Sequence, residues 1–175
     1  LQEDSIVLDF FSGSATTAHA VMQKNASEGK HCKFICVQLP EPVNEKTKNQ
    51  GYSTICEIGK ERIRRAGKKI KEEAEGVDLD TGFRVLRVDT SNMEEVYFEP
   101  AALQQDHLFG QVDSVKEDRS DLDLLFGCMV DWGVELSYPL RQEEVAGKHL
   151  YIVNEGALVA CFEEDIALEV IRAIA

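Results

Sequence analysis

The sequence predicts an α/β fold over residues 1–90, followed by a smaller α+β element over residues 119–175. Two observations favour this division. The first part has the order apolar run, glycine turn, helical pattern and second apolar run, which is typical of a βαβ unit. The second part shows one helical pattern, two strand-like runs and a final helical pattern. Residues 91–118 are acidic with only short apolar clusters, so we expect a linker there.

The elements of the first part follow from the spacing of its apolar residues. Residues 5–11 (SIVLDFF) form a run of strand length, and residues 16–28 repeat apolar side chains at helical spacing before Gly29. Residues 33–39 (KFICVQL) leave no exposed face, which is typical of a parallel strand covered on both sides. The sequence therefore predicts two parallel strands joined by a helix.

Three further segments complete the first part. Residues 43–53 are polar and predict an exposed loop. Residues 54–75 place isoleucine and alanine between charged positions at helical spacing, which predicts a long helix. Residues 82–88 (GFRVLRV) alternate imperfectly and predict a third strand.

The second part begins with a helical pattern that starts near Asp121 and stops at Gly133. Trp132 is expected to anchor the core of this part. The tripeptide Asn154-Glu155-Gly156 is a hairpin signal between two apolar runs. The two runs and the last helical pattern occupy residues 150–153, 158–162 and 165–175.

The net charge of −13 is distributed unevenly along the chain. Residues 1–71 hold 12 basic and 8 acidic side chains, whereas residues 72–175 hold 7 basic and 24 acidic ones, a net charge of −17. A surface so acidic repels DNA phosphate. Contacts with nucleic acid are therefore expected from the first 71 residues or from parts of the protein upstream.

Seven basic side chains lie on the predicted helix 54–75, and two interpretations of them stay open. Interleaved acids such as Glu57 and Glu61 can pair with them at helical spacing, which is typical of a solvated helix face. The same side chains are suited to contact DNA phosphates, although no aromatic residue is interleaved to stack on bases. The seven are Lys60, Arg62, Arg64, Arg65, Lys68, Lys69 and Lys71.

The composition also sets the broad class. No run approaches eighteen consecutive apolar residues and the N-terminus lacks the layout of a secretory signal, so we predict a cytoplasmic protein. The five cysteines form no CxxC pair and the four histidines are scattered, so we expect reduced thiols and no metal site. Leu1 is not a methionine and the last helical pattern runs to Ala175, so we expect part of a longer protein.

A candidate binding turn follows the first predicted strand. A strand that ends in a glycine turn and feeds a helix concentrates backbone N–H groups and partial positive charge, which suits the anionic tail of a cofactor. A dinucleotide fingerprint needs three glycines, but Gly13 is the only glycine in this turn. A P-loop needs a lysine at its end, and no lysine occurs before Lys24. Both of these nucleotide sites are therefore excluded.

Residues 7–21 (VLDFFSGSATTAHAV) resemble motif I of DNA amino-methyltransferases, usually D-x-F-x-G-S-G-T-T. Ala15 departs from the motif at a position where a glycine would serve a positive φ or a close approach of the cofactor. Longer stretches, among them KFICVQLPEP and GYSTICEIGKERIRRAGKKIKEE, resemble the C-terminal half of the modification (Mod) subunits of type III restriction–modification systems. The residues that match motif I are Asp9, Phe11, Gly13, Ser14, Thr16 and Thr17.

This resemblance implies a partial Rossmann-like methyltransferase fold with S-adenosylmethionine as cofactor. Asp9, Ser14 and Thr16 would hold the methionine end of the cofactor. Phe11 would pack near its adenine. Gln38 or Glu41, after the second strand, would bind the ribose hydroxyls. The implied cofactor-binding residues are Asp9, Phe11, Gly13, Ser14, Thr16, Thr17, Gln38 and Glu41.

The resemblance also implies that the catalytic residues lie elsewhere. Adenine-N6 enzymes of this group need an Asp-Pro-Pro-Tyr-type tetrapeptide, and the four prolines of this chain are never adjacent. That tetrapeptide, which decides between adenine-N6 and cytosine-N4, would precede Leu1. The whole protein would methylate adenine in double-stranded DNA as a homodimer and pair with a restriction (Res) subunit. An alternative, based on the acidic residues after position 71, is a non-catalytic docking module for the Res subunit or another protein.

Overall fold

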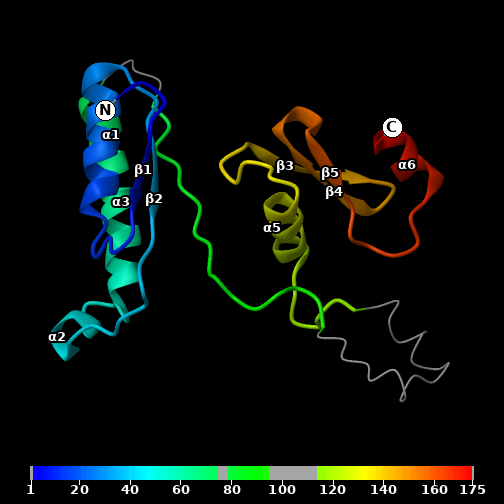
Figure 1. The fold of residues 1–175 in the computed structure, drawn as a ribbon, viewed down its shortest axis with the longest axis horizontal. Coiled ribbons are helices and arrows are strands. Elements are labelled where there is room, and N and C mark those ends of the chain that lie inside the picture. The colour runs from blue at the N-terminus through cyan, green and yellow to red at the C-terminus, as the bar shows by residue number, and fades with distance from the viewer. Residues whose placement is uncertain (1, 75–78, 95–113, 175) are drawn as a thin grey trace. The chain divides into compact units, whose positions relative to one another are not determined.

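The computed structural model describes residues 2–74, 79–94 and 114–174. The chain forms two compact units, Leu1–Phe83 and Arg84–Ala175, and each is described by itself (Figure 1). Most of the predicted linker, residues 95–113, lies outside the described residues. No helix among the described residues is long and apolar enough to cross a membrane.

The N-terminal unit contains the predicted βαβ arrangement. Strand β1 (Ile6–Asp9) runs parallel to β2 (Lys33–Cys36), and helix α1 (Thr16–Glu28) connects them. Gly29 ends α1 in the left-handed conformation, and its N–H donates to the Asn25 carbonyl. The short helix α2 (Glu45–Lys48) lies within the segment predicted as a loop, and α3 (Ile55–Glu73) is the predicted long helix. Mixed helices and strands agree with the expected α/β class.

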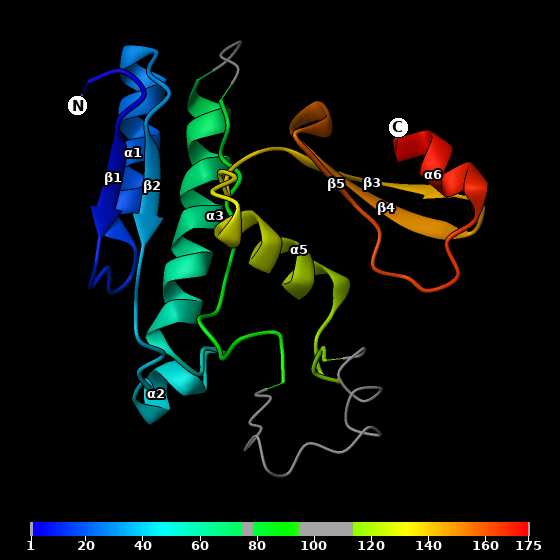
Figure 2. The same cartoon turned by 45° about the vertical axis from the view of Figure 1, so that its right-hand side comes forward.

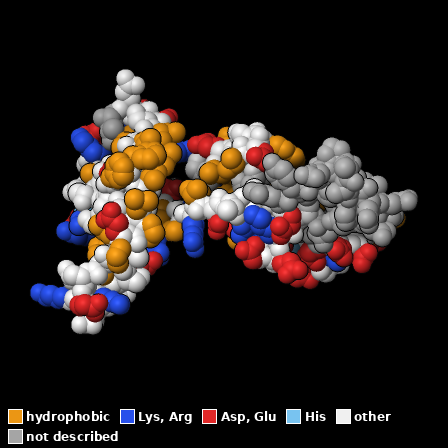
Figure 3. Space-filling model, turned by 60° about the horizontal axis from the view of Figure 1, so that its bottom comes forward, with side chains coloured by type: hydrophobic (Ala, Val, Ile, Leu, Met, Phe, Trp, Pro, Cys, Tyr) orange, Lys and Arg blue, Asp and Glu red, His pale blue; other side chains and the backbone are white. Residues whose placement is uncertain are grey.

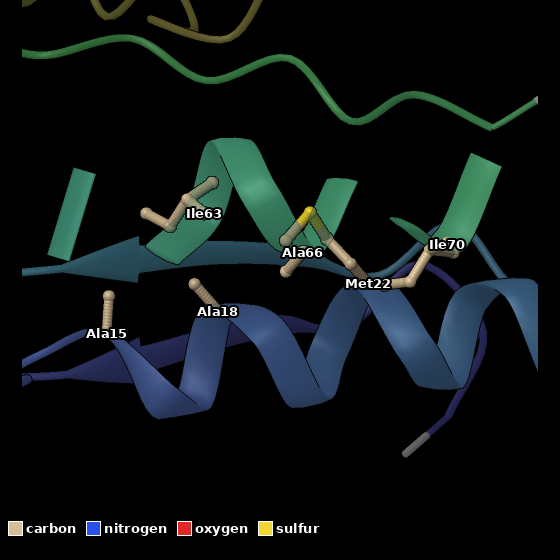
Figure 4. Close-up of a cluster of buried hydrophobic side chains, with 6 residues drawn as sticks. All are labelled: Ala15, Ala18, Met22, Ile63, Ala66 and Ile70. Atoms are coloured by element: carbon tan, nitrogen blue, oxygen red, sulfur yellow. The ribbon is translucent and has the colours of Figure 1, made fainter. Parts of the chain in front are cut away.

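The core of the N-terminal unit lies between α1 and α3, which run side by side (Figure 2). Small side chains, such as Ala18 and Ala66, allow the two helices to pack closely. Figure 4 shows the side chains of both helices pointing toward one another. The buried cluster consists of Ala15, Ala18, Met22, Ile63, Ala66 and Ile70.

The prediction that β2 is covered on both faces was wrong. Phe34 and Cys36 pack against the helical core, but Ile35 is 50% exposed on the opposite face. Ile6 and Leu8 of β1 are exposed as well. Within the part of the chain that the structure describes, the helices cover only one face of the two-stranded sheet. Figure 3 shows hydrophobic side chains gathered on the surface of this unit, at the left of the picture.

The third strand predicted at residues 82–88 is not formed. This segment pairs with no strand among the described residues. Its side chains are instead divided between the two units. Phe83 packs against the core of the N-terminal unit and beneath the Arg64 guanidinium. Arg84 belongs to the C-terminal unit, where it donates to the carbonyls of Leu136 and Tyr138.

The C-terminal unit is an antiparallel sheet of order β3-β4-β5 with two helices. The predicted hairpin is confirmed, because β4 (Lys148–Val153) and β5 (Leu158–Ala160) pair across a 3-10 turn at Asn154–Gly156. Strand β3 (Leu140–Val145) was not predicted. It joins β4 through Ala146 and Gly147, whose φ angles of 51° and 75° fit a two-residue hairpin turn.

Helix α5 (Asp121–Asp131) agrees with the prediction, and the last helix, α6, spans Leu168–Ile174. Ser120 begins α5 with a capping box, in which its hydroxyl accepts from the Asp123 N–H while the Asp123 carboxylate accepts from the Ser120 N–H. Leu125 and Met129 are buried against the sheet.

Trp132 is 70% exposed, so its predicted role as a core anchor was wrong. The reason lies in the end of α5. Gly133 adopts φ +68°, the Gly133 N–H donates to the Val130 carbonyl, and the Val134 N–H donates to the Met129 carbonyl. This Schellman arrangement turns Val134 into the core next to Met129 and leaves Trp132 outside.

Candidate cofactor-binding site

The motif turn lies at the carboxyl ends of the two parallel strands. The Val37 N–H donates to the Asp9 carbonyl at 2.9 Å, and the Ser12 N–H donates to the Val37 carbonyl at 3.2 Å. These bonds attach the turn after β1 to the chain after β2. Open α/β sheets bind ligands at this edge.

Asp9 and Thr17 are directly bonded across the turn. The Thr17 hydroxyl, in the first turn of α1, donates to the Asp9 carboxylate at 2.5 Å. The bond fixes the half-buried carboxylate at the end of β1 and leaves its second oxygen available as an acceptor. The negative charge also reaches β2: burial raises the pKa of the Cys36 thiol, and the charge of Asp9 raises it further.

Gln38 is brought to the turn as well. Its side-chain oxygen accepts from the Gly13 N–H at 2.8 Å, while its side-chain nitrogen donates to the Leu39 carbonyl at 3.2 Å. Gly13 has φ +52°, and no atom outside its chain neighbours lies within 4 Å of where its Cβ would be. The backbone at Gly13 is therefore open to a close approach from outside.

Ala15 occupies the position where the motif normally has glycine, and it adopts φ 60° and ψ 42°. A left-handed backbone is strained for alanine by about 1–2 kcal/mol. Its methyl group is buried in the core, and Figure 4 shows it pointing toward α3. The substitution therefore adds packing on the helical side of the turn.

Gly59 of α3 was not recognised from the sequence, yet it lies against this turn. A Cβ on Gly59 would stand 3.4 Å from the Ala15 Cβ and 3.5 Å from the Gly13 carbonyl oxygen. These are van der Waals distances, so α3 packs directly against the turn at Gly59, and a side chain larger than a methyl group would have little room there. The signal in the sequence was a glycine inside a strong helical pattern, where glycine costs about 1 kcal/mol relative to alanine.

The other predicted residues surround the turn in different ways. Phe11 is 79% exposed and contacts Phe10 edge to face, with ring centroids 6.1 Å apart. Thr16 is exposed at the start of α1, where no side chain caps the helix, and Ser14 is half-buried. Glu41 is exposed, and the bonds described for it are those of its backbone, to Leu39 and Ile55. The structure thus brings Gln38, and not Glu41, into a bond with the turn.

The fold and the turn define a βαβ unit with an acidic residue at the end of its first strand. No protein-family model matches the chain. Three relatives identify it further, and all are Mod subunits of type III restriction–modification enzymes. The chain is related to these subunits, which confirms the resemblance predicted from the sequence.

The extent of the match differs among the three relatives. The StyLTI Mod subunit of Salmonella typhimurium strain LT2 is 40% identical over 96 residues, covering 54% of this chain and 15% of the relative. The EcoPI Mod subunit of Escherichia phage P1 is 33% identical over 156 residues, covering 87% of this chain and 23% of the relative. The EcoP15I Mod subunit of Escherichia coli is 33% identical over 153 residues, covering 86% of this chain and 22% of the relative. The chain therefore spans less than a quarter of the length of these relatives.

Proposed function

We propose that this chain is the S-adenosylmethionine-binding portion of a type III DNA adenine-N6 methyltransferase. The observation that supports it is the turn held by the Asp9–Thr17 and Gly13–Gln38 bonds at the carboxyl ends of two parallel strands. The relationship to Mod subunits supports the same assignment. The chain itself contributes no catalytic tetrapeptide.

The residues present fit the amino-acid tail of the cofactor. Asp9 supplies a carboxylate for the ammonium group, and the start of α1, which no side chain caps, supplies N–H groups and partial positive charge for the carboxylate. Ser14 and Thr16 add hydroxyl groups at the same point. The open backbone at Gly13 admits the ligand, while the Ala15 methyl points away into the core.

The remaining contacts would come from both sides of the turn. The exposed Phe11 ring is suited to pack on the adenine, and Gln38 is suited to accept from the ribose hydroxyls once the ligand displaces its bond to Gly13. Glu41 is the second candidate for the ribose. The bound cofactor supplies the activated methyl group, and the residues of this chain hold and orient it for in-line attack by the amino nitrogen of the base.

The proposal extends to the fold and the partners of the whole protein. We infer a partial Rossmann-like fold, whose uncovered sheet face would receive further layers from the rest of a Mod-like protein. That protein would act in the cytoplasm, where its substrate, double-stranded DNA, is found. It would form a homodimer and pair with a Res subunit.

Calorimetric titration of the chain with S-adenosylmethionine tests the proposal. Thr17→Val removes the hydroxyl that holds Asp9 and should weaken binding by about three- to tenfold, whereas Thr17→Ser keeps the hydroxyl and should bind nearly as the unaltered chain does. Asp9→Asn removes the charge and should weaken binding by about tenfold or more. Glu45→Gln, which removes a carboxylate on α2, is the control. Undetectable binding by the folded chain, or equal losses in Asp9→Asn and Glu45→Gln, would refute the assignment.

A second candidate function is a docking module for a Res subunit or another protein, and the surface of α5 favours it. Leu122, Val130 and Trp132 are exposed there, in a part of the chain rich in acidic residues. Figure 3 shows acidic side chains gathered on the C-terminal unit, at the right of the picture. Exposed apolar side chains among charges are typical of protein interfaces. Retention of a Res subunit by the chain, and its loss in Val130→Ser/Trp132→Ser, would support this function.

A further inference from the structure

An open groove of about 340 Å³ lies along α3, on the N-terminal unit and apart from the eight predicted cofactor residues. Helix α1 contributes to its lining, as does the loop that precedes α3. Three cations, one carboxylate and two amphipathic rings line it. They are Arg62, Arg65, Lys69, Glu61, Tyr52 and His19.

The three cations form a row along the groove. Arg62, Arg65 and Lys69 are separated by three and then four residues, so they lie on one face of α3 in successive turns. At a rise of about 1.5 Å per residue, the row extends over about 10 Å. A row of this kind suits an extended anion and not a single compact one.

The charges of the row are only partly neutralised. Arg62 has no ion pair among the described residues. Glu61 lies 2.7 Å from Arg65 but also 3.9 Å from Arg64, which does not line the groove. Lys69 is 3.6 Å from Glu73, and both side chains are well exposed. Exposed ion pairs of this kind contribute only about 0–1 kcal/mol, so an incoming phosphate can compete for these cations.

Tyr52 adds a polar donor and a ring, although no aromatic residue is interleaved in the sequence of the helix. It reaches the groove from the loop before α3, and the Arg65 guanidinium donates to its hydroxyl at 3.4 Å. Arginine, lysine and tyrosine side chains are among those that contact DNA phosphates. His19 offers a further ring nitrogen from α1.

We propose that this groove is a contact site for the phosphate backbone of DNA. A DNA strand presents a phosphate about every 3.4 Å of helix axis, so the row of cations spans about three phosphates. The planar guanidinium groups of Arg62 and Arg65 suit phosphate oxygens better than point charges do. The inference rests on the proposed function, because it assigns DNA positioning to the same portion of the protein that would bind the cofactor.

Two triple variants of α3 with the same change in charge test the groove. The first, Arg62→Gln/Arg65→Gln/Lys69→Gln, removes the cations that line it. The control, Arg64→Gln/Lys68→Gln/Lys71→Gln, removes three cations of the same helix that do not. Binding of a fluorescent duplex of arbitrary sequence to the full chain is measured by anisotropy in a salt titration, without cofactor.

The groove variant should bind DNA at least tenfold more weakly, and its slope of log K against log[salt] should flatten by roughly 2 to 3 units, about 0.9 for each lost contact. The control variant should stay within about twofold of the unaltered chain. Bound duplex should also protect Lys69, but not Lys68, from acetylation. Equal losses in the two variants, no measurable DNA binding by the unaltered chain, or equally strong competition by poly-glutamate would overturn the proposal.

The two proposals can fail separately. Both triple variants should bind S-adenosylmethionine as the unaltered chain does, because no groove residue lies among the eight cofactor residues. Loss of DNA binding with intact cofactor binding supports the groove. Intact DNA binding with absent cofactor binding refutes only the cofactor assignment.

Discussion

Strands β2 and β4 are both short apolar runs, yet they are buried to different extents. In β4, four consecutive residues, Leu150 to Val153, are all buried. In β2, burial alternates, and every second side chain is exposed. The run in β2 was expected to be covered on both faces, whereas the helices cover only one.

The difference shows that burial depends on what covers a strand as much as on its sequence. In the C-terminal unit, β3 and β5 flank β4 on both edges, and α5 packs against its Tyr151 and Val153 side chains. The N-terminal unit places both of its long helices against one face of the sheet. Its stability should therefore depend on the contact between α1 and α3, and that of the C-terminal unit on the contact between its helix and its sheet.

The largest effect is expected from truncation in the self-contained core of the C-terminal unit. Leu125 is fully buried on α5, so Leu125→Ala should lower the free energy of unfolding by about 2–5 kcal/mol. Leu122, on the same helix, is 45% exposed, and Leu122→Ala should cost much less. Urea unfolding followed by the fluorescence of Trp132, the only tryptophan, measures both. Similar losses in the two variants would contradict the described packing of α5.

The helix caps of the two units provide the next comparison. Ser120 caps α5 through a reciprocal capping box, so Ser120→Ala should destabilise the C-terminal unit by about 1 kcal/mol. Thr54 stands at the same position of α3 without a side-chain hydrogen bond, so Thr54→Ala should leave the N-terminal unit nearly unchanged. Denaturant unfolding followed by circular dichroism compares the two. A larger loss in Thr54→Ala would reverse the comparison.

Two carboxylates with lowered pKa values should respond differently to salt. Lys24 and Lys30 lower the pKa of Glu28 to about 2, whereas the backbone N–H of His149, followed by its ring, lowers the pKa of Glu163. Both carboxylates stabilise the folded chain above their ordinary pKa of 4.5, and the stabilisation is lost as the pH falls through the lowered value. Glu28→Gln and Glu163→Gln should therefore lower the stability of the folded chain near neutral pH, and this loss of stability should disappear in acid.

At neutral pH, added salt should change the loss of stability in the two variants to different extents. Added salt screens the exposed ion pairs of Glu28 and should remove the loss in Glu28→Gln. The main partner of Glu163 is a backbone N–H, so the loss in Glu163→Gln should persist. Thermal unfolding from about pH 7 down to about pH 2, at low and high salt, measures both effects. Equal salt sensitivity would show that Glu163 acts mainly through charge.

Local signals in the sequence predicted most elements of the fold. Gly29, Gly133 and the tripeptide Asn154-Glu155-Gly156 end or turn their elements as expected, because turn chemistry depends on few residues. Strand β3 was missed because its centre, Arg141 to Glu144, is polar, and its conformation depends on pairing with β4. The signal that could have found it was the dipeptide Ala146-Gly147.

The candidate site was predictable only in part, because some of its contacts join segments that are distant in the sequence. The spacing of motif I made Asp9 and Thr17 candidates, and the structure joins them by a hydrogen bond. Gln38 was a candidate because the resemblance implies a ribose-binding residue after the second strand, and its side chain accepts from the Gly13 N–H. The close approach of Gly59 joins residues distant in the chain and has no local signature. The DNA groove likewise combines α1, α3 and the loop that carries Tyr52. Contacts of this kind follow from packing, which the spacing of one segment does not encode.

The smallest effect is expected on the uncovered face of the sheet in the N-terminal unit. Ile35 is 50% exposed on β2, so Ile35→Ala should lower the free energy of unfolding by less than about 1 kcal/mol. Ile63 is 5% exposed between α3 and α1, and Ile63→Ala, an identical chemical change, should cost about 2–5 kcal/mol. Urea unfolding of the two variants under the same conditions measures the ratio of their losses in unfolding free energy.

The ratio distinguishes a free sheet face from a covered one. If Ile35→Ala costs as much as Ile63→Ala, another surface must cover the face of β2 in solution, and sedimentation of the unaltered chain would then reveal self-association that dilution reverses. If the ratio is as expected and the chain sediments as a monomer, the apolar face of β1 and β2 is open in the isolated chain. Its stability then comes from the packing of α1 on α3, since those helices bury the only core that the described residues of this unit form.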